Sequence, residues 1–125
     1  MQSRTMSIVI GVVVALVIAP AGLAGGGVAG TYTASIKGPA TIKGTWVLTL
    51  TKGAYRVSLD GRVLARGDHT ATPTTITFRE PAGCGGSGTY AWRRSGKTMT
   101  FVRKREAPTC QIRGAVLSRR FTQVR

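Results

Sequence analysis

Few side chains in this 125-residue chain could do acid–base chemistry, because the whole supply is four carboxylates and one histidine. The best arrangement is Asp68-His69, which could activate a serine such as Ser58 or Ser87. Adjacent residues of a strand point to opposite faces, however, and the chain has no Gly-x-Ser-x-Gly elbow. We therefore expect a structural surface histidine, no catalytic residues, no metal and no cofactor.

Positive charge is the chain's larger chemical resource. It has 18 Lys and Arg against 4 Asp and Glu, a formal charge of +14. The apolar share of 42 % is too high for a disordered basic tail, so this charge belongs to a folded domain. The length allows one domain.

The first 24 residues have the features of a secretory signal peptide. Arg4 precedes an apolar run over residues 8–19, and Pro20 ends any helix there. The run is shorter than the ~20 residues of a membrane span, which argues against the alternative, a retained anchor. The candidate cleavage sites are Ala21, Ala24 and Ala29, with Ala24 preferred.

The two cysteines, Cys84 and Cys110, are expected to form a disulfide, because export leads to an oxidising compartment. The bond would stabilise the fold by roughly 3 kcal/mol. A metal site built on the two cysteines is disfavoured, because His69 is the only histidine that could serve as a further ligand. Gly25–Gly30 is expected to be a flexible lead-in, which leaves the domain at 31–125.

After residue 30 the apolar side chains recur at every second position, which is typical of strands. Trp46, Leu48 and Leu50 share one face in this way. Asp60-Gly61 suits a type I′ hairpin, whose two central residues need positive φ. The eight expected strands are 31–36, 46–51, 55–59, 62–66, 75–79, 89–93, 98–102 and 117–122.

Strands joined by tight turns form an antiparallel up-and-down meander. Seven of its aromatic residues fall on one face, and an open sheet would expose that face together with two free edges. Closure into a small all-β barrel of about eight strands removes both problems, and a two-sheet sandwich is the alternative. The seven aromatic residues are Trp46, Tyr55, Phe78, Tyr90, Trp92, Phe101 and Phe121.

At Gly44-Thr45-Trp46 the chain resembles the lipocalin-like barrels of the calycin superfamily. Those proteins carry Gly-x-Trp before the first long strand and an arginine that packs across the indole, a favourable cation–π pair. The resemblance implies that Arg113, Arg119 or Arg120 pairs with Trp46, and Arg113 is preferred. The chain is similar to small secreted bacterial barrels along Trp46 to Arg113, but it is shorter than a typical lipocalin.

The interior side chains either fill the barrel or surround a pocket for a small apolar ligand. A void above ~300 Å³ that is open at one end would indicate a carrier. The candidate walls are Trp46, Tyr55, Phe78, Tyr90, Trp92 and Phe101.

The basic residues alternate with the apolar face and should lie on the exterior. They form either a solvated surface or a site for polyanions of the cell envelope, whereas nucleic acid is a poor partner for an exported protein. Arg103-Lys104-Arg105 is expected in a loop before Cys110. The candidate polyanion surface consists of Arg56, Arg66, Arg79 and Arg93.

A second class of function is protein binding. Small disulfide-tied barrels that resemble this chain also inhibit extracellular enzymes by presenting a rigid loop, and 82–88 beside Cys84 is the best candidate here. The favoured expectation is a monomeric, non-catalytic binding protein that is secreted or located in the cell envelope.

Overall fold

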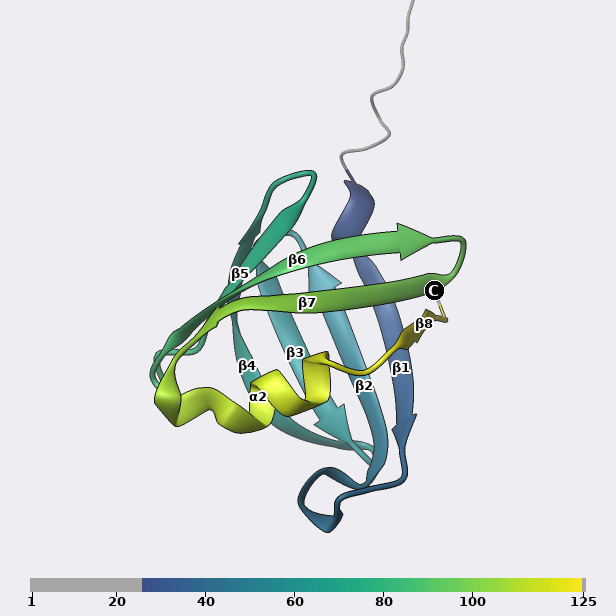
Figure 1. Cartoon of the computed structure of the whole chain (residues 1–125), viewed down its shortest axis with the longest axis vertical. Coiled ribbons are helices and arrows are strands. Elements are labelled where there is room, and N and C mark those ends of the chain that lie inside the picture. Colours follow the sequence, from purple (N-terminus) through teal and green to yellow (C-terminus); the bar gives the residue numbers. More distant parts are fainter. Residues whose placement is uncertain (1–25, 125) are drawn as a thin grey trace, which may run out of the picture.

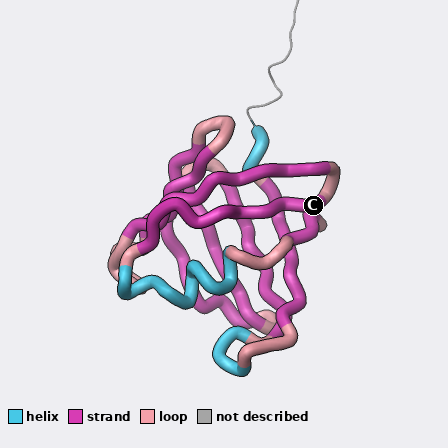
Figure 2. Tube along the Cα trace, viewed as in Figure 1, coloured by secondary structure: helices cyan, strands magenta, loops and turns pink. Residues whose placement is uncertain are grey.

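The chain folds as a closed antiparallel barrel in which eight strands follow one another in sequence order. A computed structural model describes residues 26–124 (Figures 1 and 2), so the expected signal peptide and the candidate cleavage sites at Ala21 and Ala24 lie outside the described residues. The up-and-down barrel is confirmed and the sandwich is excluded. The strands are β1 (Gly30–Ile36), β2 (Gly44–Thr51), β3 (Ala54–Leu59), β4 (Arg62–Ala71), β5 (Thr75–Arg79), β6 (Ser87–Ser95), β7 (Thr98–Glu106) and β8 (Phe121–Gln123).

Tight turns set the register of the ladder. Leu59 pairs with Arg62 across Asp60-Gly61, and both turn residues have positive φ, which confirms the expected hairpin. Asp60 Oδ1 also accepts the Thr45 N–H at 2.9 Å. At the neighbouring Gly44, φ is +137° and a Cβ would collide with Leu59 and the Asp60 carboxylate. The positive φ therefore favours glycine at this position of the Gly-x-Trp motif, and the β3–β4 turn approaches it closely.

A helix stands where the sequence pattern predicts a strand. α2 (Gln111–Leu117) carries Leu117, and β8 begins only at Phe121. Seven residues make barely two turns, too few to show a helical period, and the buried Val116 and Leu117 supply the packing that stabilises the helix. Arg103-Lys104-Arg105 is also not a loop, since it lies within β7.

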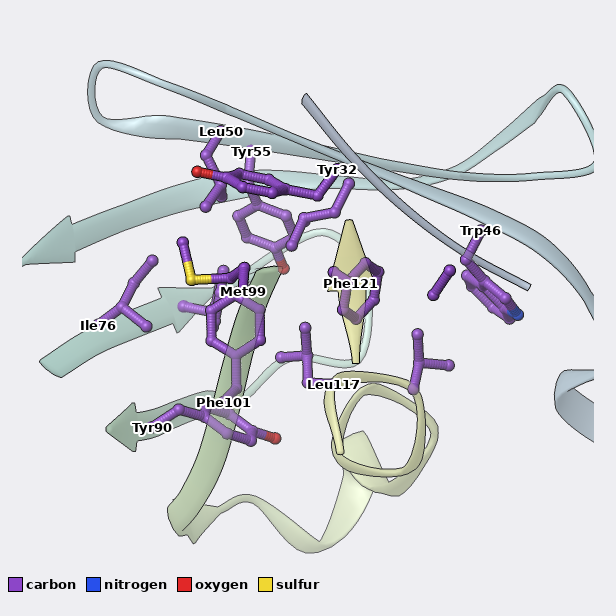
Figure 3. Close-up of a cluster of buried hydrophobic side chains, with 14 of the residues drawn as sticks. Tyr32, Trp46, Leu50, Tyr55, Ile76, Tyr90, Met99, Phe101, Leu117 and Phe121 are labelled. Carbon is purple, nitrogen blue, oxygen red and sulfur yellow. The ribbon is translucent and has the colours of Figure 1, made fainter. Parts of the chain in front are cut away.

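The core is a cluster of buried hydrophobic side chains inside the barrel, in which aromatic rings meet edge to face (Figure 3). Phe78 makes edge contacts with Tyr55, Tyr90 and Phe101, and Phe101 makes one with Phe121. Such edge-to-face pairs are favourable because the positive ring edge meets the negative face. These side chains are almost completely buried, and Tyr90 and Phe101 among them pack against each other away from any cavity wall.

Residues 26–30 of the expected flexible lead-in are instead packed on the barrel, and Gly25 lies outside the described residues. A 3-10 turn, η2 (Gly26–Val28), precedes β1; Val28 is buried, and its carbonyl accepts the Tyr32 hydroxyl at 2.8 Å. The phenol needs an acceptor once it is buried, and this contact supplies one. No helix within residues 26–124 has the length and apolar character needed to cross a bilayer.

Candidate functional site

An apolar cavity lies between α2 and strands β2 to β4. Its volume is about 260 Å³. The ladder explains the opening: β4 pairs with β5 only over Asp68–Ala71, so Arg62–Gly67 pairs with β3 alone among the described strands. α2 packs beside β7 and supplies the facing wall of the cavity with Val116 and Leu117.

Three of the six residues expected as pocket walls line this cavity, namely Trp46, Tyr55 and Phe78. Tyr90 and Phe101 lie instead in the filled part of the core. Trp92 is only partly buried, and its indole N–H donates to the Thr72 carbonyl at 2.9 Å, near the β4–β5 turn. The six expected wall residues therefore do not surround a single pocket, because only some of them line the cavity and the others are packed in the core or lie near the β4–β5 turn.

Two apolar side chains that the aromatic pattern did not suggest stand at the opening. Leu64 and Ile112 both line the cavity, yet they are 52 % and 53 % exposed. A register shift in β3–β4 follows Val57 and makes Leu64 an extra residue in its strand. A simple two-residue alternation places Leu64 on the outer face, which is why the sequence pattern missed it.

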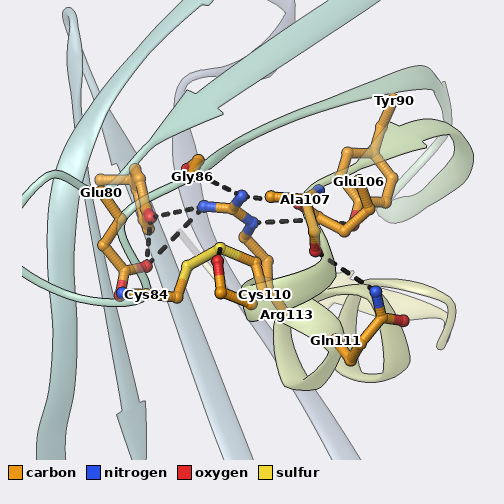
Figure 4. The surroundings of a disulfide bond; sticks show 11 residues. Glu80, Cys84, Gly86, Tyr90, Glu106, Ala107, Cys110, Gln111 and Arg113 are labelled. Carbon is orange, nitrogen blue, oxygen red and sulfur yellow. Dashed lines mark hydrogen bonds and ion pairs between the residues drawn. A yellow bond between two sulfur atoms is a disulfide. The ribbon is translucent and has the colours of Figure 1, made fainter.

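Arg113 forms the polar end of the cavity, together with two glutamates (Figure 4). Its Nε and Nη2 donate to the two oxygens of Glu106 at 2.9 and 2.7 Å, and Nη2 also donates to the Gly86 carbonyl at 3.1 Å. Nη1 makes only longer contacts, 3.5 Å to the Tyr55 hydroxyl and 3.9 Å to Glu80 Oε1. The guanidinium is thus held firmly on one side and loosely on the other.

Hydrogen bonds to tyrosine complete this polar end. The Tyr55 hydroxyl donates to Glu80 Oε1 at 2.6 Å, and the Tyr90 hydroxyl donates to Glu106. Burial and these bonds to carboxylates raise the pKa of both phenols. Burial alone would raise the pKa of Glu106, but hydrogen bonds from Arg113, Tyr90 and the Ala107 N–H outweigh it and lower that pKa.

The Cys84–Cys110 disulfide, which is confirmed, brings these groups together. Glu80 and Glu106 each stand four residues before a cysteine, and Arg113 stands three residues after Cys110. Glu106 and Arg113 flank the same cysteine, and joining the two cysteines brings Glu80 to them. This repeated spacing is a signal in the sequence that could have indicated the network.

The expected stacking of Arg113 on Trp46 is absent from the structure. The cation–π contact among the described residues is that of Arg94 over the Tyr32 ring, at 5.8 Å. The N–H donors of the Arg113 guanidinium form stronger hydrogen bonds with the nearby carboxylates than they could with an indole face. Of the other two arginines considered, Arg119 binds the Gly38 carbonyl at 2.9 Å and Arg120 is exposed.

Outside the barrel, three of the four expected surface arginines are neighbours. Arg56 and Arg66 are directly opposite each other on β3 and β4, and Arg79 lies opposite Asp68 on the next pair. Arg93 lies apart, opposite Thr100 near the end of β6. The cluster is therefore smaller than expected and includes one carboxylate.

The remaining residues singled out from the sequence do not converge. His69 is buried, not on the surface, and its Nε2 is 2.7 Å from the Thr51 carbonyl oxygen. Asp68 is exposed on the other face of β4. The loop 82–88 is largely exposed and is held at its base by the disulfide, while Cys84 N–H donates to Glu80 Oε2 at 3.3 Å.

The fold and the cavity define a small, disulfide-tied, eight-stranded β-barrel with an apolar recess. The disulfide indicates a non-reducing compartment. The chain matches no protein-family model, no curated protein and no solved structure.

Proposed function

We propose that this chain is an exported, non-catalytic binding protein that holds a small apolar molecule in the cavity beneath α2. The cavity itself is the observation that carries the proposal. Its walls are mostly apolar, and Leu64 and Ile112 give it an apolar entrance. Recesses of this chemistry favour apolar ligands because water leaves them readily.

The volume of about 260 Å³ is below the ~300 Å³ expected of a carrier, and it restricts the size of the ligand. Pockets for drug-sized ligands have roughly 300–1,000 Å³, so this cavity suits a smaller molecule such as a short alkyl chain. Each methylene that enters should contribute about 0.8 kcal/mol, close to a fourfold gain in affinity. Affinity should therefore rise along the linear alcohols and level off once the cavity is full.

Tryptophan fluorescence provides the test, because Trp46 lines the cavity and Trp92 does not. In a Trp92→Phe variant, Trp46 is the only tryptophan, and its emission should change saturably as 1-octanol is added. Ala65 lines the cavity and Ala71, on the same strand, is exposed. Adding Ala65→Phe should abolish the response, whereas Ala71→Phe should leave it intact. No response in the folded Trp92→Phe protein would exclude the proposal.

We also propose a distant relationship to the lipocalin-like barrels and a signal peptide at 1–24. Gly44-Thr45-Trp46 at the head of β2 and the ordered meander of eight strands support the first. The disulfide supports export. Secretion would be tested by N-terminal sequencing of the exported protein, which should begin after Ala21, Ala24 or Ala29.

A second candidate function is binding of envelope polyanions. Glu80 and Glu106 are engaged within the Arg113 network, so Asp60 and Asp68 are the acidic residues left on the outer surface. Arg56 and Arg66 form a pair of directly opposite cations on β3 and β4. Arg56→Gln/Arg66→Gln should weaken binding to heparin, and the loss should exceed that of Arg93→Gln/Lys97→Gln. Equal effects would indicate diffuse charge attraction instead of a site.

A further inference from the structure

We propose that the cavity selects an apolar molecule with an uncharged, hydrogen-bonding head, such as an alcohol or a primary amide, and discriminates against a carboxylate. This inference rests on the proposed function and adds the chemical class of the ligand. It follows from the hydrogen bonds that the polar end of the cavity has left to make.

The available donor is Arg113 Nη1. A guanidinium has five N–H groups, and those on Nε and Nη2 are directed to Glu106 and the Gly86 carbonyl at 2.7–3.1 Å. Nη1 has contacts at only 3.5 and 3.9 Å, which are weak by the usual geometric limits. Arg113 is among the residues that line the cavity. A ligand oxygen placed there would gain a strong donor without displacing an existing short bond.

The available acceptor is the Glu80 carboxylate, which also lines the cavity. Its Oε1 accepts the Tyr55 hydroxyl at 2.6 Å, and its Oε2 accepts the Cys84 N–H at 3.3 Å. An ionised carboxylate has about four lone-pair sites, so acceptor capacity remains. A hydroxyl or amide head can accept from Nη1 and donate to Glu80, whereas a carboxylate has no proton to donate.

The charges of the neighbouring side chains also favour an uncharged head. One guanidinium, Arg113, is close to two carboxylates, and the Glu106 side chain is only 1 % exposed. A carboxylate head placed at Nη1 would lie beside the Glu80 carboxylate, so two groups of like charge would meet in a poorly hydrated place. A cationic head can donate to Glu80 but has no lone pair to accept from Nη1, and the positive charge of the guanidinium beside it offsets the attraction of Glu80.

The test compares four ligands with the same alkyl chain: 1-octanol, octanamide, octanoate and octylamine. Trp46 emission in the Trp92→Phe protein reports binding at neutral pH. We expect octanol and octanamide to bind at least about tenfold more tightly than octanoate or octylamine. Octanoate or octylamine binding as tightly as octanol would overturn the inference and leave the proposed function intact. Failure of all four ligands would reject the proposed function itself.

Glu80→Gln provides the matched variant. Its amide carbonyl can still accept the Tyr55 hydroxyl, so the fold has a substitute for that bond, and thermal unfolding checks that it is retained. Neutralising Glu80 removes one negative charge, and the preference for octanol over octanoate should shrink by about tenfold. An unchanged preference in the folded variant would show that Glu80 does not set the selectivity.

Discussion

At the scale of single residues, Arg113 does most to shape the site. Its fork binds both oxygens of Glu106, whose side chain is almost fully buried. Bidentate pairs of this kind are strong, and removing one partner leaves a charge in a place where water cannot reach it. The resemblance to lipocalin-like barrels gave Trp46 as the internal partner of Arg113, which is wrong, because the partner is Glu106, seven residues earlier in the chain.

Replacing Arg113 with Met should lower the free energy of unfolding by about 3–5 kcal/mol, since Glu106 would lose its counter-ion. Glu106→Gln should also destabilise. The double variant should cost less than the two single changes added together, because the groups are in direct contact. Urea unfolding of the three proteins measures this coupling. Arg93→Met serves as the surface control, with an expected change within about 0.5 kcal/mol. Strictly additive effects would argue against the pair.

The lowered pKa of Glu106 predicts a specific dependence on pH. Its folded-state pKa lies below the ordinary value of 4.5, so folding disfavours protonation of this carboxyl. The stabilising contribution is then complete above about pH 4.5 and is lost as pH falls through the folded-state pKa. The melting temperature of the wild type should decrease in this acid range. Glu106→Gln should start lower and show a shallower decrease, and parallel curves would contradict the assignment.

At the scale of elements, local patterns determined the strands and the turns but not α2. Strands β2, β3 and β5 to β7 were visible as two-residue alternations, and Asp60-Gly61 carried its own turn chemistry. The helix was not visible because its stability comes from packing, not from seven residues of helical propensity. The register shift after Val57 was hidden for a similar reason, since a single extra residue leaves the alternation on either side intact.

The β3–β4 hairpin offers a direct test at this scale. Gly61 has a φ of +86° with open space around it, so Gly61→Ala probes backbone conformation alone. An L-residue in that region costs about 1–2 kcal/mol, and the melting temperature should decrease by about 4–8 °C for each kcal/mol. Gly38→Ala, another site with open space but without positive φ, should change it far less. Equal melting temperatures for the two variants would contradict the interpretation that the turn requires a positive φ at Gly61.

At the scale of the whole molecule, closure of the barrel buries the interior tyrosines and thereby changes their pKa values. All three tyrosines of the chain are buried, and burial raises the pKa of each above 10.0. Carboxylate partners raise the pKa of Tyr55 and Tyr90 further. Arg94 lowers the pKa of Tyr32, but less than burial raises it.

In an alkaline titration, ionisation of the tyrosines should therefore coincide with unfolding of the whole barrel. Because the folded-state pKa values are raised, the tyrosines contribute stability below about pH 10 that is lost as pH rises further. We expect no phenolate absorbance in the native protein near pH 10, followed by ionisation of all three tyrosines together as the protein unfolds. Circular dichroism should change over the same range. A tyrosine that titrates near pH 10 while the barrel is intact would contradict this expectation.

The sequence by itself predicted the all-β class, the antiparallel meander, the disulfide and the inward aromatic face, because each depends on local alternation, turn residues or a single possible cysteine pairing. It favoured a barrel and left a two-sheet sandwich open, and the structure decided for the barrel. Only the tertiary structure decided where the cavity lies, that Arg113 binds Glu106 instead of Trp46, and that Leu64 and Ile112 stand at the entrance. These features depend on the incomplete β4–β5 ladder and on groups that the disulfide brings together. Such long-range distances are set by closure of the barrel, and local sequence patterns do not encode them.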